Sequence, residues 1–194
     1  MIEHYLQKMK QLCPAFSQSD VDFIQSRLSV RELPPKAVFL QAGEVPKYMG
    51  MVGSGLLKTF YLTEGGEQIN INFCQEGQVV GDYLAFMHQT PSKYSFQALE
   101  YSRLIEFPYA HWQTCLQEIP AFERYVRLML EAVFAAYLAR TEEFLIADAE
   151  ARYRYFVQKQ PDLFRRLSLS DLCSYLGIQR QHLTRIRKNL LTQK

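Results

Sequence analysis

The spacing of apolar residues changes twice along the 194-residue chain, and each change predicts a different kind of structure. Near the N-terminus Leu6, Met9, Leu12 and Phe16 recur at helical spacing. Between about residues 31 and 108 the pattern becomes short apolar runs separated by turn residues, which is typical of antiparallel strands. Beyond that region the helical spacing returns. We therefore expect an α+β protein whose strands form a jelly roll.

One of the predicted strands alternates strictly between apolar and polar residues. The stretch EQININF places Ile69, Ile71 and Phe73 on one side of a strand and asparagines on the other. Glycine-containing turns such as GSG and TEGGEQ separate the neighbouring runs. Short strands at this regular spacing favour a two-layered sandwich or a barrel.

The longest uninterrupted helical pattern covers residues 121–146, which contain neither Gly nor Pro. At 1.5 Å per residue such a helix would be roughly 39 Å long. A nearly heptad seam runs along it at Phe122, Val126, Met129, Val133, Ala136 and Arg140. Apolar residues also occupy other faces, so we expect the helix to cover its own sheet and a second subunit in a homodimer. The alternative is a central helix buried within one monomer.

A break at residues 147–148 separates this helix from a smaller C-terminal unit. Asp148 suits the N-cap of a new helix, which should end before Pro161. The chain then divides into a jelly-roll sensor domain with flanking helices (residues 1–120), a dimerisation helix and hinge (121–147) and a helical domain (148–194).

Residues 168–190 predict two helices joined by a tight turn. Ser168 suits the cap of the first helix, Asp171 suits its first turn, and Gly177 can take the positive φ that the turn needs. Apolar residues three and four apart should form the inner faces. These are Leu169, Leu172, Cys173, Leu176, Ile178, Leu183, Ile186 and Leu190.

The outer face of the second helix has the chemistry of a major-groove reader. It consists of Arg180, Gln181, Thr184, Arg185, Arg187 and Lys188. Arg can form two hydrogen bonds with guanine and Gln can do so with adenine, whereas Arg187 and Lys188 are better placed for phosphates. The alternative is an ordinary helical hairpin with a solvated basic face.

Charge is distributed unevenly along the chain. The formal net charge is +2, but five Lys and Arg residues and no acid follow Asp171, which leaves −3 for the rest. A basic end on a near-neutral body points to an acidic partner for that end alone, or to a solubilising tail.

Other classes of function find little support. Cys13, Cys74, Cys115 and Cys173 are far apart, so no metal or iron–sulfur site is expected, and neither is a cofactor. The four histidines are isolated, and no nucleophilic triad or phosphate-binding loop occurs, so we expect no enzyme. We find no signal peptide and no apolar run long enough to cross a membrane, and we expect a cytoplasmic protein.

Several segments together resemble the Crp/Fnr family of transcription regulators. The barrel opening reads VFLQAGEVPKYMGMVGSGLLKTFYLTEGGEQ, and a later segment reads EGQVVGDYL. The entry into the long helix reads LIEFPYAHWQTCLQEIPAF, and the C-terminal motif reads LSLSDLCSYLGIQRQHLTRIRKNL. The resemblance covers almost the whole chain and looks closest to short members from Bacteroidetes-type bacteria.

The resemblance implies a homodimeric regulator that reads near-palindromic double-stranded DNA and contacts RNA polymerase. Arg180, Gln181 and Arg185 would reach base edges, with Gln181 where the best-known members carry Glu. A small-molecule effector would lie in the barrel. Its site would comprise Gly81, Asp82, Ser92, Lys93, Tyr94 and Tyr137.

This sequence departs from the family pattern in three places. Cyclic-AMP-binding members carry Gly-Glu and then Arg-Ser, where this chain has Gly81-Asp82 and Ser92-Lys93. Lys93 lacks the two-pronged geometry of Arg, so we expect an effector other than cyclic AMP, or a barrel that serves only as a platform. The N-terminal cysteine cluster of oxygen sensors is absent. The sequence stops four residues after Leu190, so we expect no full wing after the reading helix. A sensor or scaffold that signals through a protein partner remains the alternative function.

Overall fold

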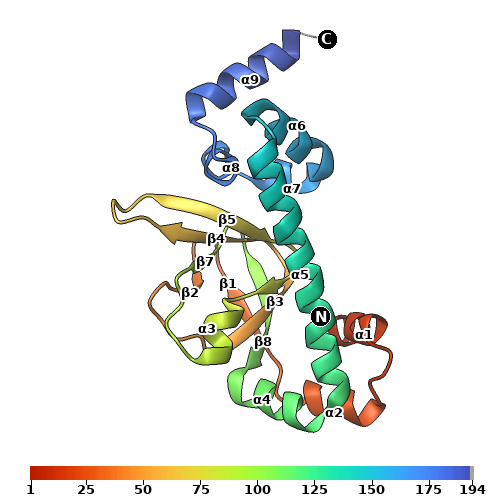
Figure 1. Cartoon of the computed structure of the whole chain (residues 1–194). Helices are drawn as coiled ribbons and strands as arrows, with labels where there is room; N and C mark the ends of the chain where they lie inside the picture. Colours follow the sequence, from red (N-terminus) through yellow and green to blue (C-terminus); the bar gives the residue numbers. More distant parts are fainter. Residues whose placement is uncertain (193–194) are drawn as a thin grey trace.

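The computed structural model describes residues 1–192, with side chains for residues 1–189. Figure 1 shows a β-sandwich against one side of a long helix, with the N-terminal helices at one end of that helix and the C-terminal helices at the other. The described helices are α1 (Ile2–Leu12), α2 (Gln18–Gln25), α3 (Tyr83–His88), α4 (Tyr109–Glu118), α5 (Pro120–Ile146), α6 (Ala149–Lys159), α7 (Pro161–Arg166), α8 (Leu169–Leu176) and α9 (Arg180–Thr192). The strands are β1 (Ser29–Leu33), β2 (Val38–Leu40), β3 (Tyr48–Ser54), β4 (Leu57–Leu62), β5 (Gln68–Cys74), β6 (Val79–Val80), β7 (Ser95–Ala98) and β8 (Ser102–Pro108).

The strands form two four-stranded antiparallel sheets, in the orders β1-β8-β3-β6 and β2-β7-β4-β5. Sequence neighbours such as β1 and β2 lie in different sheets, so the connections cross between the two layers. This arrangement confirms the predicted α+β fold with a jelly-roll domain. Between the sheets, inward-facing residues from both layers, including Val52, Leu57 and Leu104, are almost completely buried.

Strand β5 departs from the strict alternation that its sequence suggests. The pairing of β4 with β5 shifts register between Thr59 and Phe60, so Ile71 has no directly paired residue on β4. As a result Ile69 is 40% exposed, whereas Asn70 is only 3% exposed. The prediction that Ile69 shares one face with Phe73 was therefore wrong, because a bulge changes which side chains point toward the body of the protein.

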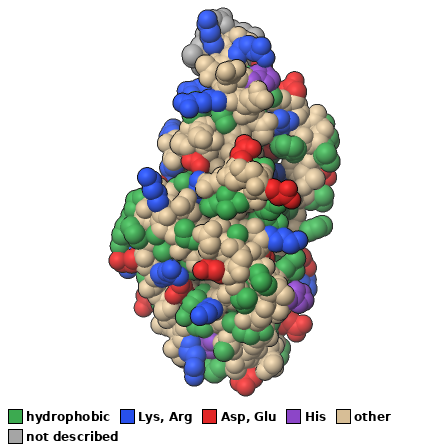
Figure 2. Space-filling view, turned by 90° about the vertical axis from the view of Figure 1, so that its left-hand side faces the viewer, with side chains coloured by type: hydrophobic (Ala, Val, Ile, Leu, Met, Phe, Trp, Pro, Cys, Tyr) green, Lys and Arg blue, Asp and Glu red, His purple; other side chains and the backbone are tan. Residues whose placement is uncertain are grey.

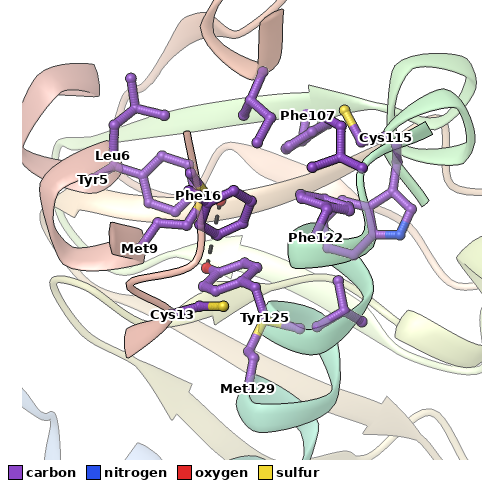
Figure 3. Close-up of a cluster of buried hydrophobic side chains, with 14 of the residues drawn as sticks. Tyr5, Leu6, Met9, Cys13, Phe16, Phe107, Cys115, Phe122, Tyr125 and Met129 are labelled. Atoms are coloured by element: carbon purple, nitrogen blue, oxygen red, sulfur yellow. Dashed lines mark hydrogen bonds between the residues drawn. The ribbon is translucent and has the colours of Figure 1, made fainter. Parts of the chain in front are cut away.

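A second core lies where the N-terminal helices pack on the start of α5 (Figure 3). Phe122 is fully buried, and Tyr125 and Met129 face Tyr5 and Met9 of α1. The hydroxyl of Tyr125 donates to that of Tyr5 at 3.5 Å. This core anchors the first part of α5 firmly to its own chain.

Candidate nucleic-acid interface and effector cavity

Helices α8 and α9 are joined by the tight turn that the sequence predicts. The Ser168 hydroxyl caps α8 by accepting a hydrogen bond from the Asp171 backbone at 3.0 Å. Gly177 ends α8 with a φ of +62°, and the Ile178 N–H donates to the Cys173 carbonyl at 3.0 Å, as in a Schellman motif. A β-carbon at Gly177 would approach the Phe144 ring to 2.9 Å, so glycine serves both conformation and packing here.

The inner face of α9 fixes which way the helix points. Leu183 and Ile186 are buried among Leu172, Leu176 and residues of α6 and α7. The side chain of Leu190, which we also expected to point inward, lies outside the described residues. With two inner positions fixed three residues apart, the rest of the helix surface faces away from the protein.

All six residues assigned to DNA from the sequence lie on that outward surface. Arg180, Gln181, Thr184, Arg185, Arg187 and Lys188 are exposed. The Thr184 hydroxyl donates to the Arg180 carbonyl at 2.9 Å, so in this state it is used within the helix. Figure 2 shows Lys and Arg side chains gathered at the α9 end of the molecule. Since α9 contains no acid, this end presents positive charge.

The C-terminal helices are docked on the outer side of β4 and β5 by a polar cluster that the sequence did not reveal. Lys58 forms an ion pair with Asp171 at 3.2 Å, with both side chains largely buried. The Asn70 side chain donates to the Asp171 carboxylate at 3.1 Å. Burial alone would raise the pKa of Asp171, but hydrogen bonds from Ser168 and Asn70 and the charge of Lys58 lower it below its usual value.

Ser174 of α8 completes the hydrogen bonding of strand β5, which is the last strand of its sheet. Its hydroxyl accepts from the Asn70 backbone N–H at 2.8 Å and donates to the Gln68 carbonyl at 3.0 Å. Two side-chain bonds thus take the place of a further strand. No local pattern in the sequence indicates this contact, because the partners are more than 100 positions apart.

Arg166, at the end of α7, forms a second link to the sandwich. Its guanidinium donates to Glu76 at 2.9 Å and to Glu100 at 2.6 Å. The hydrogen bond from Arg166 lowers the pKa of Glu76, and the two carboxylates raise that of Arg166. Because Glu76 and Glu100 belong to different loops of the sandwich, the link holds α7 against both.

A cavity of about 810 Å³ opens between the sandwich, α5 and the C-terminal helices. Four of the six residues predicted to bind an effector line it: Gly81, Asp82, Tyr94 and Tyr137. Ser92 and Lys93 do not line it, and this part of the prediction was wrong. Ser92 is buried and donates to the Asp82 carboxylate at 3.1 Å, while Lys93 is exposed to solvent.

The Asp82 carboxylate forms part of the cavity wall. Asp82 caps α3, accepting from the Ala85 N–H at 3.1 Å, and also accepts from Ser92. These two donors are therefore already used by the chain's own carboxylate.

The first half of the seam predicted for the dimer interface faces the chain itself. Phe122, Val126 and Met129 are buried in the core shared with α1, so they cannot also contact a partner. Val133, Ala136 and Arg140 line the cavity instead. The assignment of the first three residues to a dimer interface was therefore wrong. Sequence could not fix which stripe faces outward, because α5 is apolar on more than one side.

A different stripe of α5 is exposed. Phe134, Leu138 and Leu145 recur four and seven residues apart, and 48–79% of each residue's surface is exposed. Positions at this spacing lie on one side of a helix. Single exposed apolar residues are ordinary, but a row of three large ones along a helix is typical of faces that pack on another surface.

The described residues reveal neither a membrane-spanning element nor a metal site. No helix within residues 1–192 is long and apolar enough to cross a membrane. In the same part of the chain, no three His, Cys, Asp or Glu side chains gather as metal ligands. The four cysteines are buried thiols.

Comparison with known proteins agrees with this fold. Residues 30–119 match the cyclic nucleotide-binding domain family. No curated protein matches the sequence. Among solved structures, the chain is similar to a protein from Eubacterium rectale assigned to the Crp/Fnr family of transcriptional regulators (TM-score 0.74, 12% identity, 96% of this chain and 88% of that chain).

Two further solved structures are similar. One is the c-di-GMP responsive global regulator CLP of Xanthomonas campestris (TM-score 0.71, 16% identity, 91% of this chain and 93% of that one). The other is the catabolite activator protein of Thermus thermophilus (TM-score 0.58, 17% identity, 94% and 87%). These relatives are regulators rather than enzymes. The chain thus carries a region matching the cyclic nucleotide-binding domain family, within an overall fold that it shares with transcription regulators, including one of the Crp/Fnr family.

Proposed function

We propose that the protein is a dimeric transcription regulator of the Crp/Fnr type that reads double-stranded DNA with α9. The observation that carries this proposal is the orientation of α9. Leu183 and Ile186 turn inward, and the six basic and polar residues between Arg180 and Lys188 turn outward without an acid among them. A helix of this kind can enter a major groove, with Arg180, Gln181 and Arg185 reaching bases and its other cations reaching phosphates.

The second copy packs on the exposed stripe Phe134, Leu138 and Leu145. A twofold arrangement through α5 would present two copies of α9 to successive major grooves, roughly 34 Å apart on a near-palindromic site. A test of this interface is Leu138→Glu, which should convert the dimer to a monomer in sedimentation. The matched control is Leu62→Glu, because Leu62 is also exposed but lies on β4. A wild-type protein that is monomeric at micromolar concentration, or a dimeric Leu138→Glu variant, would refute the interface.

Selection from a random pool of double-stranded DNA tests the reading function. The purified dimer should enrich an inverted repeat, and affinity for that repeat should fall steeply with salt as bound cations release counterions. Arg185→Ala should cost about 1–3 kcal/mol on the selected site and relax one base position. Arg103→Ala removes one positive charge from the sandwich, where Arg103 pairs with Glu32, and should leave base preference unchanged. Enrichment of no inverted repeat would refute DNA reading and favour signalling through a protein partner.

A further inference from the structure

Two arginines converge on the end of α8 nearest the cavity. Arg140 of α5 donates to the Tyr175 carbonyl at 2.9 Å, and Arg152 of α6 donates to the Leu176 carbonyl at 3.1 Å. Arg152 also donates to the Ala147 carbonyl at 2.7 Å. Because the first two carbonyls are consecutive at a helix C-terminus, both guanidinium groups are brought to one place, and both residues line the cavity.

These two cations have hydrogen bonds but no carboxylate in contact. Among the described residues, no ion pair within 4.0 Å involves either arginine. Glu143 also lines the cavity and lies close enough for both arginines to act on its charge, yet it touches neither. Burial lowers the pKa of Arg140 to about 10, so it is a partly desolvated cation. Each guanidinium has five N–H donors, more than its bonds to carbonyls use.

Aromatic rings hold both guanidinium groups in place. Arg140 lies over the Tyr175 ring at 3.5 Å and Arg152 over the Phe144 ring at 4.7 Å. The two guanidinium groups are stacked on rings and hydrogen-bonded to backbone carbonyls. They are therefore largely immobilised before a ligand binds, which reduces the entropy lost on binding.

The rest of the cavity has a different character. Away from the arginines its wall is mainly apolar, with Ile71, Phe96, Met129 and Val133. The Asp82 carboxylate lies on the sandwich side of the same cavity. A volume near 810 Å³ is within the range of pockets that enclose small organic ligands. An anionic group is therefore favoured at the arginines and disfavoured beside Asp82.

We propose that this cavity binds an amphipathic organic acid, with its carboxylate on Arg140 and Arg152 and its apolar body along α5 toward the sandwich. This orientation places the negative charge at the C-terminal helices rather than in the sandwich. The ligand would touch α5, the sandwich and the group that carries α9 at once. If the protein is the regulator proposed above, this ligand is its effector, and this role rests on that proposal. Binding in the cavity would then be coupled to the position of α9.

Calorimetry on the full chain with sodium decanoate, and separately with decanol, tests the proposal. Decanoate should bind one site per chain, and decanol should bind at least tenfold more weakly because it lacks the charge. Arg152→Gln and Arg140→Gln should each weaken decanoate at least tenfold. The matched control is Arg154→Gln, which removes an exposed cation on the same helix that pairs with Glu150. Ala136→Trp, which places a large ring in the cavity while keeping both arginines, should also weaken decanoate binding.

Each outcome decides the matter. If decanoate does not bind, binds no better than decanol, or binds equally to Arg152→Gln, Ala136→Trp and the wild type, the proposal is overturned. Circular dichroism identifies an arginine variant that fails to fold. The comparison of decanoate with decanol on the wild type then tests the anion site, and Ala136→Trp tests the cavity. Calorimetry needs no DNA, so loss of acid binding with intact DNA binding refutes only this inference. Acid binding without DNA binding refutes only the proposed function.

Discussion

The contact between α8 and strand β5 can be tested by removing one hydroxyl. Ser174→Ala deletes the acceptor of the Asn70 backbone N–H and the donor to the Gln68 carbonyl. Asn70 is 3% exposed, so its N–H would lose its partner where water has little access, at a cost of about 1–3 kcal/mol. Gln68 is exposed, and water can replace the bond to its carbonyl. Alanine favours a helix over serine by about 0.5 kcal/mol. The net loss of unfolding free energy should be about 0.5–2.5 kcal/mol.

Urea unfolding followed by Trp112 fluorescence measures that loss. Trp112 is the one tryptophan of the chain and is buried in α4, which lies at the far end of the molecule from α8. Hydrogen exchange of the Asn70 backbone N–H should be faster in the variant than in the wild type, even under conditions where the rate of global unfolding is the same. The control is Thr114→Ala, whose exposed hydroxyl bonds only to Ala110 within its own helix and should change stability by no more than about 0.5 kcal/mol. Unchanged exchange at Asn70 in Ser174→Ala would show that the helix does not dock on β5 in solution.

Three further outcomes follow from the same structure. Phe122→Ala should cost about 3–5 kcal/mol of unfolding free energy, measured in urea, because the fully buried ring leaves a cavity; a cost below about 1 kcal/mol would contradict the packing in Figure 3. The pKa of Asp171 is lower in the folded protein than its unfolded value of about 3.9. The ionised carboxylate therefore stabilises the fold at pH values above about 3.9, and this stabilisation is lost as the pH falls through the lower folded pKa. Asp171→Asn should therefore flatten the acid limb of a stability–pH curve. Burial raises the pKa of Cys74 to about 11 and that of Cys115 to about 12, so a thiol reagent at pH 7 should modify either only at the rate of unfolding; fast modification of the native protein would contradict their burial.

Features fixed by neighbouring residues could be predicted from the sequence. Ser168 and Gly177 mark the start and end of α8 through bonds within a few positions, and both were found as expected. The spacing of Leu183 and Ile186 likewise fixed the inner face of α9. In each case the chemistry that decides the conformation lies within one or two helical turns.

Features fixed by distant residues could not be predicted. Asn70 lies in a stretch of alternating apolar and polar residues, where a polar side chain should face water. It is buried instead, because Asp171 and Ser174, which lie about 100 positions away in the sequence, form hydrogen bonds with it. Lys93 is next to residues of the cavity in sequence, but the Ser92 hydroxyl turns to Asp82 and Lys93 points to solvent. Both outcomes depend on which surfaces meet, and an alternation of apolar and polar residues does not contain that information.

The two ends of helix α5 pack against different parts of the protein. Its first part is buried against α1, so Phe122 and Met129 tie it to the N-terminal core. Its last part meets the C-terminal helices, where the Phe144 ring lies against Gly177 and Arg140 holds the Tyr175 carbonyl. The helix is continuous over 27 residues, so one element connects the N-terminal core and the cavity wall to the end of α8. The apolar residues on its several faces therefore serve two contacts within the chain and leave one stripe exposed, where we propose that a second subunit packs.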